Sequence, residues 1–246
     1  MREQPEQQAP PVQRLRIRYA KRGRLRFTSH RDFSRAFERA VVRARVPMAY
    51  SSGFNPHPRI SYAGAAPTGA ASEAEYLEIG LREEVDPAAL LAALDEALPP
   101  GLDVLEVAVS PGGSLADRLE GSIWRTTVRG VTPAAASAAV AAFLAAEEVP
   151  VERMTKKGMR TFDCRAAVVG LSVAPSPDGD PECAILDTVL RHGVPAVRPD
   201  DVLAGLRNAG GLEAVPVPYH ERLAQGPLDV RAGTVGDPLA PDRDTA

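Results

Sequence analysis

Residues 14–19, RLRIRY, and residues 29–47, SHRDFSRAFERAVVRARVP, are the two segments that most constrain the architecture. The first alternates strictly between arginine and an apolar residue, which predicts a strand with one buried face. In the second, Ser29 followed by Asp32 predicts a helix start, apolar side chains recur at helical spacing, and Pro47 ends the helix. A strand leading into an amphipathic helix is therefore expected.

The rest of the first half of the chain is expected to form further strands and one more helix. The alternation resumes at 24–27 (RLRF) after a bend at Gly23. Further elements are expected in this order: short strands at 48–52 and 59–67, a strand at 73–81, a helix at 86–98 and a strand at 102–110. The order β-α-β-β-α-β is that of the split βαβ, or ferredoxin-like, arrangement.

The second half nearly repeats this order. A strand at 123–130 and a proline-started helix at 132–147 precede a hairpin over 149–173, a strand at 182–190, a helix at 198–211 and a strand at 212–220. The predicted fold class is α+β, with two tandem ferredoxin-like units at 14–110 and 123–225 and a linker at 111–122. Residues 1–13 and 226–246 are polar or rich in Pro, Gly and Asp, so both are expected to be disordered.

Composition excludes several classes of protein. No run approaches the roughly 18 apolar residues of a membrane span, and the first residues do not resemble a signal sequence, so a cytoplasmic bacterial protein without a membrane association is expected. The two cysteines, Cys164 and Cys183, are too few for a zinc ribbon or an iron–sulfur cluster. We expect them to be small buried hydrophobes, and we expect no metal and no cofactor.

The charge is distributed unevenly. Residues 1–60 contain 14 Lys or Arg and 4 Asp or Glu, whereas the remaining residues contain 15 and 28. Within the first segment, two rows of arginine share a strand face and a helix side: Arg14, Arg16 and Arg18, and Arg31, Arg35 and Arg39. We expect them to form one contiguous positive surface for a phosphate backbone or an acidic partner. The alternative is a solvated face without a partner.

The segment YSSGFNPHPRISY, residues 50–62, places His57 between Pro56 and Pro58. Each proline fixes its own φ and favours an extended residue before it, so the loop is stiff. A stiff loop loses little entropy on binding, which makes Asn55, His57 and Arg59 candidate binding residues. The alternative is that the prolines only shape the chain. The flanking aromatic residues, Tyr50, Phe54 and Tyr62, either stack bases or pack in the core.

His30, at the predicted helix start, is a candidate general base, because the helix dipole favours its neutral imidazole. His57 and Asp32 are the other catalytic candidates, and His30 and His57 are expected to face a common cleft. The alternative is that His30 only packs while Ser29 and Asp32 cap the helix. His30, Asp32 and His57 as metal ligands would be a weak pattern, since they are scattered over 28 residues.

The opening Ser29-His30-x-Asp32, the loop YSSGFNPHPRIS, Pro67-x-Gly69 and SEAEY at 72–76 closely resemble the radical-SAM-linked family of bacterial proteins. That family occurs free or fused to cobalamin-binding radical SAM proteins, so the resemblance implies a radical SAM enzyme as a partner. It covers about residues 14–110. The segment YAGAAPTG departs from the family, which has bulkier apolar residues before the proline.

Three functions are consistent with the sequence. The first is a non-catalytic accessory module of a radical SAM or RNA-processing enzyme, which binds RNA or the partner through the basic N-terminal unit. The second is a metal-independent RNA-cleaving enzyme that uses His30 and His57. It is disfavoured because only NAGG at 208–211 approaches the glycine-rich loop of such enzymes. The third is a pure protein-interaction adaptor. The sequence does not define an oligomeric state.

Overall fold

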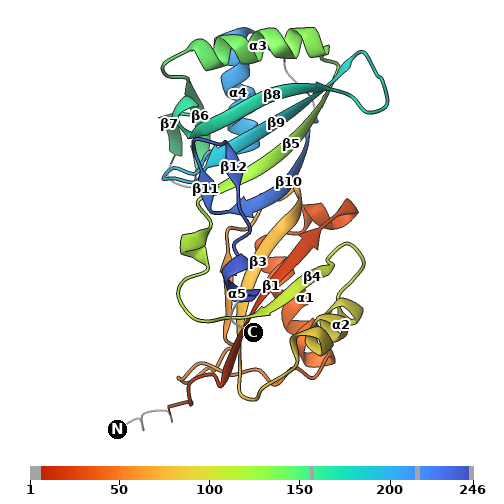
Figure 1. Cartoon of the computed structure of the whole chain (residues 1–246), viewed down its shortest axis with the longest axis vertical. Helices are drawn as coiled ribbons and strands as arrows, with labels where there is room; N and C mark the ends of the chain where they lie inside the picture. The colour runs from red at the N-terminus through yellow and green to blue at the C-terminus, as the bar shows by residue number, and fades with distance from the viewer. Residues whose placement is uncertain (1–6, 156–157, 214–216, 244–246) are drawn as a thin grey trace. The chain divides into compact units, whose positions relative to one another are not determined.

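The computed structural model describes residues 7–155, 158–213 and 217–243. The chain divides into two compact units (Figure 1): unit 1 comprises Met1–Arg118 with Asp237–Ala246, and unit 2 comprises Leu119–Gly236. Both units combine helices with antiparallel strands, which confirms the α+β class. The boundary between the units falls inside the segment 111–122. None of the described helices is long and apolar enough to cross a membrane.

Unit 1 is a sheet with two long helices on one face. Its strands pair in the order β4-β1-β3-β2, and every pairing is antiparallel. The elements in chain order are β1 (Gln13–Lys21), the 3-10 turn η1 (Gly23–Phe27), α1 (His30–Arg43), β2 (Ile60–Ala63), β3 (Ala71–Leu81), α2 (Pro87–Ala97), β4 (Val104–Val109), the 3-10 turn η2 (Ala116–Arg118) and α5 (Ala240–Arg243).

The core of unit 1 lies between the sheet and its helices. Leu15 and Ile17 of β1 belong to one buried apolar cluster with Phe33 and Phe37 of α1. Tyr19, on the same strand face, stacks on Phe33 with ring centroids 4.3 Å apart. Since successive side chains of a strand alternate between faces, the arginines of β1 point away from α1.

Helix α1 begins as the sequence predicts. The Ser29 hydroxyl accepts a hydrogen bond from the Asp32 backbone N–H at 3.2 Å and donates one to the Asp32 carboxylate at 2.7 Å. Asp32 is therefore engaged in capping the helix. The strand predicted at 24–27 is wrong, because these residues lie in the turn η1. Gly23 has a left-handed φ of 53°, which turns the chain at this point.

The C-terminal segment corrects a second prediction. Residues 226–246 were expected to be disordered, but β10 extends to Gly226, and the short strands β11 (Leu228–Asp229) and β12 (Thr234–Val235) follow it. Helix α5 then belongs to unit 1, where Arg243 forms an ion pair with Glu106 at 2.6 Å. Composition predicted disorder, but specific partners for the charged side chains order the described residues.

Within unit 2 four strands pair in the order β10-β5-β9-β8, and each of these pairings is antiparallel. Its other elements in chain order are β5 (Gly121–Arg129), α3 (Pro133–Ala145), β6 (Pro150–Thr155), β7 (Gly158–Asp163), the 3-10 turn η3 (Arg165–Ala167), β8 (Val168–Pro175), β9 (Cys183–Arg191), α4 (Pro199–Gly210) and β10 (Tyr219–Gly226). The predicted hairpin over 149–173 is in fact the separate hairpin β6–β7 followed by β8. Its tip, at 156–157, lies outside the described residues.

A half-buried histidine makes the stability of unit 2 sensitive to pH. His192 Nδ1 lies 2.7 Å from the Leu119 carbonyl, and Nε2 lies 3.0 Å from the Ser122 hydroxyl. Because the carbonyl can only accept, Nδ1 carries the proton, and Nε2 accepts from Ser122 in the neutral ring. Burial lowers the pKa of His192 below its ordinary value, in spite of the opposing bond to Leu119.

We expect the free energy of unfolding to fall as the pH drops below about 6.5, the ordinary histidine pKa. The unfolded chain binds this proton more readily than the folded chain, so acid favours unfolding, and the loss continues down to the lowered pKa of the folded state. Urea unfolding of the wild type and of His192→Gln at several pH values measures the effect. The wild type should lose more stability than the variant between pH ~7.5 and ~5.5. Identical losses would contradict this role of His192.

Candidate nucleic-acid interface

The two predicted arginine rows lie on opposite faces of the unit 1 sheet. Leu15 and Ile17 face α1, so Arg14, Arg16 and Arg18 face the other way. The second row follows α1. One contiguous positive surface made of both rows is therefore ruled out, because the sheet and its core separate them.

Arg16 is part of the interior of unit 1. Its side chain is wholly buried, and all of its nitrogens are hydrogen-bonded. Nε donates to Glu78 at 3.0 Å, Nη1 donates to both carboxylate oxygens of Asp242 at 3.0 Å, and Nη2 donates to the carbonyls of Gly112 and Gly113 at 2.8 Å. Arg118 also donates to Asp242, at 2.7 Å. Arg16 therefore joins the strand to the C-terminal segment and is not available to a nucleic acid.

The other arginines of β1 are also engaged. Arg14 lies 3.7 Å from Glu78, and Nε of Arg18 donates to the Glu73 carbonyl at 2.9 Å. The sequence could not separate these residues from a binding row, because the carboxylates that approach them come from β3 and from the C-terminal segment.

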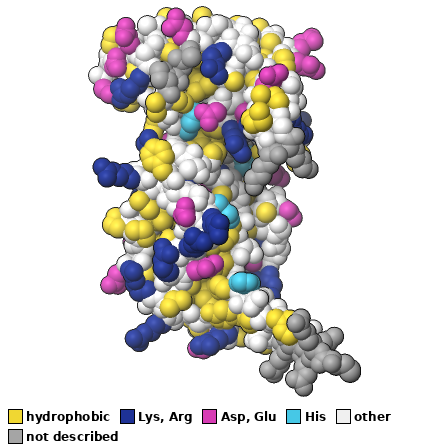
Figure 2. Space-filling view, turned by 180° about the vertical axis from the view of Figure 1, so that it is seen from behind, with side chains coloured by type: hydrophobic (Ala, Val, Ile, Leu, Met, Phe, Trp, Pro, Cys, Tyr) yellow, Lys and Arg dark blue, Asp and Glu magenta, His cyan; other side chains and the backbone are white. Residues whose placement is uncertain are grey.

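The arginines of α1 are different. Arg31, Arg35 and Arg39 are exposed, and among the described residues none has a carboxylate oxygen within 4.0 Å. Arg35 and Arg39 line a shallow hollow with Glu38 and the exposed Val42. The space-filling view of Figure 2 shows Lys and Arg side chains gathered on a face of unit 1, with fewer acidic side chains among them. Within the part of the chain that the structure describes, no ion pair neutralises Arg31, Arg35 and Arg39, which we call the unneutralised row.

His30 occupies the first turn of α1 and is exposed. Its ring meets Tyr62 of β2 edge-on, with centroids 4.9 Å apart and planes at 90°. Burial raises the pKa of the Tyr62 phenol, and the neighbouring Ser34 hydroxyl opposes that rise. The ring of Tyr62 also contacts Phe33, so Tyr62 is a packing residue rather than a free stacking platform.

The loop after α1 is held closed by two hydrogen bonds between the same pair of residues. The Ser51 N–H donates to the His57 carbonyl at 2.9 Å, and the His57 N–H donates to the Ser51 hydroxyl at 3.0 Å. Arg59 supports the base of the loop, since its Nε donates to the Tyr50 carbonyl at 3.1 Å. The stiffness that the prolines predict is thus reinforced by a clamp, which we call the Ser51–His57 clamp.

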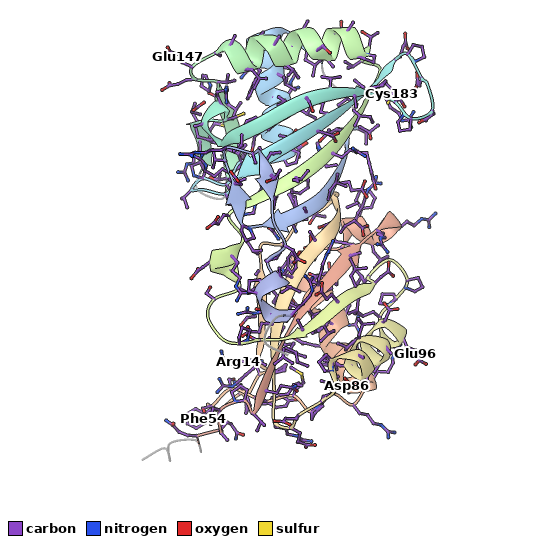
Figure 3. All side chains as sticks on the ribbon, viewed as in Figure 1. Arg14, Phe54, Asp86, Glu96, Glu147 and Cys183 are labelled. Carbon is purple, nitrogen blue, oxygen red and sulfur yellow. The ribbon has the colours of Figure 1, made fainter. Side chains whose placement is uncertain are left out.

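The clamp presents its intervening residues to solvent. Phe54 is 71% exposed and Asn55 and the His57 ring are also exposed. Figure 3 shows Phe54 on this loop, away from the sheet. Gly53 has a φ of 128°, which side chains rarely tolerate, so this glycine sets the shape of the tip.

His30 and His57 do not share a site, which corrects the expected common cleft. Helix α1 follows the end of β1 where Lys21 pairs with Ser72. The loop lies at the other end, because the Arg59 carbonyl accepts from Gly80, near Leu81 at the far end of β3. The start of α1 and the loop before β2 therefore lie near opposite ends of β3.

The described residues contain no group of three or more His, Cys, Asp or Glu side chains placed to hold a metal ion. Cys164 and Cys183 are free and buried, in agreement with the sequence prediction. Burial is the main reason that the pKa of the Cys164 thiol rises to about 12, so it is not a reactive thiolate at neutral pH.

Sequence reasoning missed two features of unit 1. The composition around Asp242 predicts disorder, and the burial of Asp242 against Arg16 has no local signal because 226 positions separate the pair. Phe27 was placed in a strand, yet it is 59% exposed in η1, with the Arg26 guanidinium 4.5 Å from its ring centre. Gly23, the first residue of η1, is the sequence signal that the strand ends before these residues.

A family of bacterial proteins matches most of this α+β chain. The family described as "Uncharacterized protein conserved in bacteria (DUF2344)" matches residues 14–199. The chain belongs to this bacterial family, whose match includes α1 and the clamped loop. No curated protein matches the chain.

Among solved structures, the chain is similar to a protein from Galdieria sulphuraria whose structure is titled "Crystal Structure of an Unknown Protein". The two sequences are 12% identical, and the match covers 85% of this chain and 98% of the other, with a TM-score of 0.25.

Proposed function

We propose that the chain is a non-catalytic accessory module that binds RNA through the outer face of α1. The unneutralised row of Arg31, Arg35 and Arg39 carries this proposal. Residues four apart on a helix are neighbours on one side of it, so the three guanidinium groups follow one line. Such a row suits a phosphate backbone, which gains affinity by releasing the counterions of the nucleic acid.

The contrast with the strand row supports the proposal. Arg14 and Arg16 have carboxylates within 4.0 Å, whereas the α1 arginines have none among the described residues. Like charges at this spacing repel by a few tenths of a kcal/mol per pair, which a bound polyanion would reverse. The separation of His30 from His57 argues against an acid–base pair that cleaves RNA.

Fluorescence anisotropy with a labelled RNA oligonucleotide tests the proposal. We expect the triple variant Arg31→Gln/Arg35→Gln/Arg39→Gln to bind at least about tenfold more weakly than the wild type. Its matched control, Arg160→Gln/Arg191→Gln/Arg207→Gln, removes the same charge from exposed positions of unit 2 and should bind as the wild type does. Equal losses of RNA affinity in both variants would mean that net charge alone explains the effect, and they would overturn the proposed site.

The proposal includes a radical SAM or RNA-processing enzyme as the partner of this module. The sequence contains two cysteines, Cys164 and Cys183, too few to hold an iron–sulfur cluster, so any radical chemistry would belong to that partner. Mixing the purified chain with a candidate enzyme tests the association by gel filtration. Two separate peaks at micromolar concentrations would count against it.

We also infer that each unit has the ferredoxin-like topology. Unit 1 has the order β4-β1-β3-β2, which supports it. In unit 2 the order β10-β5-β9-β8 repeats the pattern, with β6–β7 inserted after α3. An experimental structure with another strand order in either unit would refute the inference.

A further inference from the structure

Exposed aromatic side chains are confined to one part of the described chain. Phe27, Tyr50 and Phe54 are exposed, and all three belong to unit 1, which also carries the unneutralised arginines. A large exposed aromatic ring is expensive to leave in water, and it is a common contact for nucleic-acid bases.

Phe54 is the best placed of the three to receive a planar ligand. It is 71% exposed, whereas Tyr50 is 42% exposed and Phe27 has the Arg26 guanidinium over one face. Among the described residues, no ring or cation contact covers Phe54. The Ser51–His57 clamp fixes the loop on both sides of it, which lowers the entropy cost of binding.

The stretch of chain that includes the loop has basic side chains and no acidic ones. No Asp or Glu occurs between Glu38 and Glu73, and this interval includes all of the loop together with Arg39, Arg43, Arg45 and Arg59. A phosphate backbone could therefore approach the Phe54 ring without carboxylate repulsion from this interval. A protein partner with an apolar pocket would use the ring too, but it would gain less from the absence of carboxylates.

We propose that Phe54 stacks on an unpaired base, so that unit 1 binds single-stranded rather than duplex RNA. This rests on the proposed function and names the substrate class of that interface. Bases in a duplex are already stacked, and their faces are closed to a protein ring, so stacking selects unpaired nucleotides.

Anisotropy titrations with a labelled oligouridine and with a duplex RNA of the same length test this inference. The wild type should prefer the single strand. Phe54→Ala should lose about tenfold in affinity for the single strand and little for the duplex, while Phe54→Trp should retain the preference. Ser51→Ala, which removes the acceptor for the His57 N–H, should weaken single-strand binding less than Phe54→Ala does.

Met154→Ala is the matched control, because Met154 is an exposed apolar residue of unit 2. It should bind both RNAs as the wild type does. If Phe54→Ala binds the single strand as tightly as the wild type while the α1 triple variant does not, the stacking inference fails and the proposed function stands. If the wild type binds neither RNA, the proposed function fails, and the inference fails with it.

Discussion

Asp242→Ala should lower the free energy of unfolding by about 3–5 kcal/mol, the usual cost of removing one partner from a buried ion pair. The Asp242 carboxylate accepts a hydrogen bond from Nη1 of Arg16 at 3.0 Å and another from Nη1 of Arg118 at 2.7 Å. The Arg16 and Asp242 side chains are wholly buried, so without the carboxylate a guanidinium remains in the interior with part of its charge uncompensated. A protein of this size has about 5–15 kcal/mol of stability in total.

Urea unfolding measures the effect, and Asp237→Asn provides the control. Asp237 also pairs with an arginine, Arg243, but both side chains are partly exposed to solvent. A pair of that kind contributes about 0–1 kcal/mol, so the control should barely shift the urea midpoint. If Asp242→Ala costs no more than Asp237→Asn, the C-terminal segment does not hold unit 1 together in the way described.

Gly210→Ala should destabilise unit 2 by about 1–3 kcal/mol, the usual cost of inserting a group into a closely packed contact. A Cβ atom at Gly210 would lie 2.4 Å from the Ala139 Cα and 2.7 Å from its carbonyl oxygen. Both are backbone atoms, so α4 would have to move away from α3.

Gly193→Ala is the control for that substitution, because nothing lies within 4 Å of a Cβ at Gly193 and its φ is not left-handed. Thermal unfolding of both variants separates the loss of glycine from the loss of close helix packing. We expect Gly193→Ala to unfold at the wild-type temperature. A Gly210→Ala midpoint equal to that of Gly193→Ala would mean that α3 and α4 tolerate a wider separation.

The parts of the fold that depend on local chemistry could be predicted from the sequence. Strict alternation at 14–19 predicts β1, and Ser29 with Asp32 predicts the start of α1, because capping involves residues only three positions apart. The stiffness of the loop around His57 follows in the same way from its two prolines, although the Ser51 clamp was not foreseen.

The candidate site depends on long-range contacts, which no local pattern reveals. In the sequence Arg16 and Arg35 are equivalent members of basic rows. In the structure Arg16 is buried against Asp242, from the far end of the chain, whereas Arg35 remains exposed on α1. Local sequence likewise does not separate Tyr62 from Phe54. Both are aromatic residues at the loop, but Tyr62 packs on Phe33 and Phe54 is exposed.

The salt dependence of RNA binding tests the central claim most directly. For a single strand, the logarithm of the affinity falls with the logarithm of the salt concentration, with a slope of about −0.7 per phosphate contacted. Titrations of an oligouridine between about 50 and 200 mM salt should give a shallower slope for Arg31→Gln/Arg35→Gln/Arg39→Gln than for the wild type, by about 2. The unit 2 control should keep the wild-type slope. Equal slopes for the wild type and the α1 variant would contradict phosphate binding by this helix.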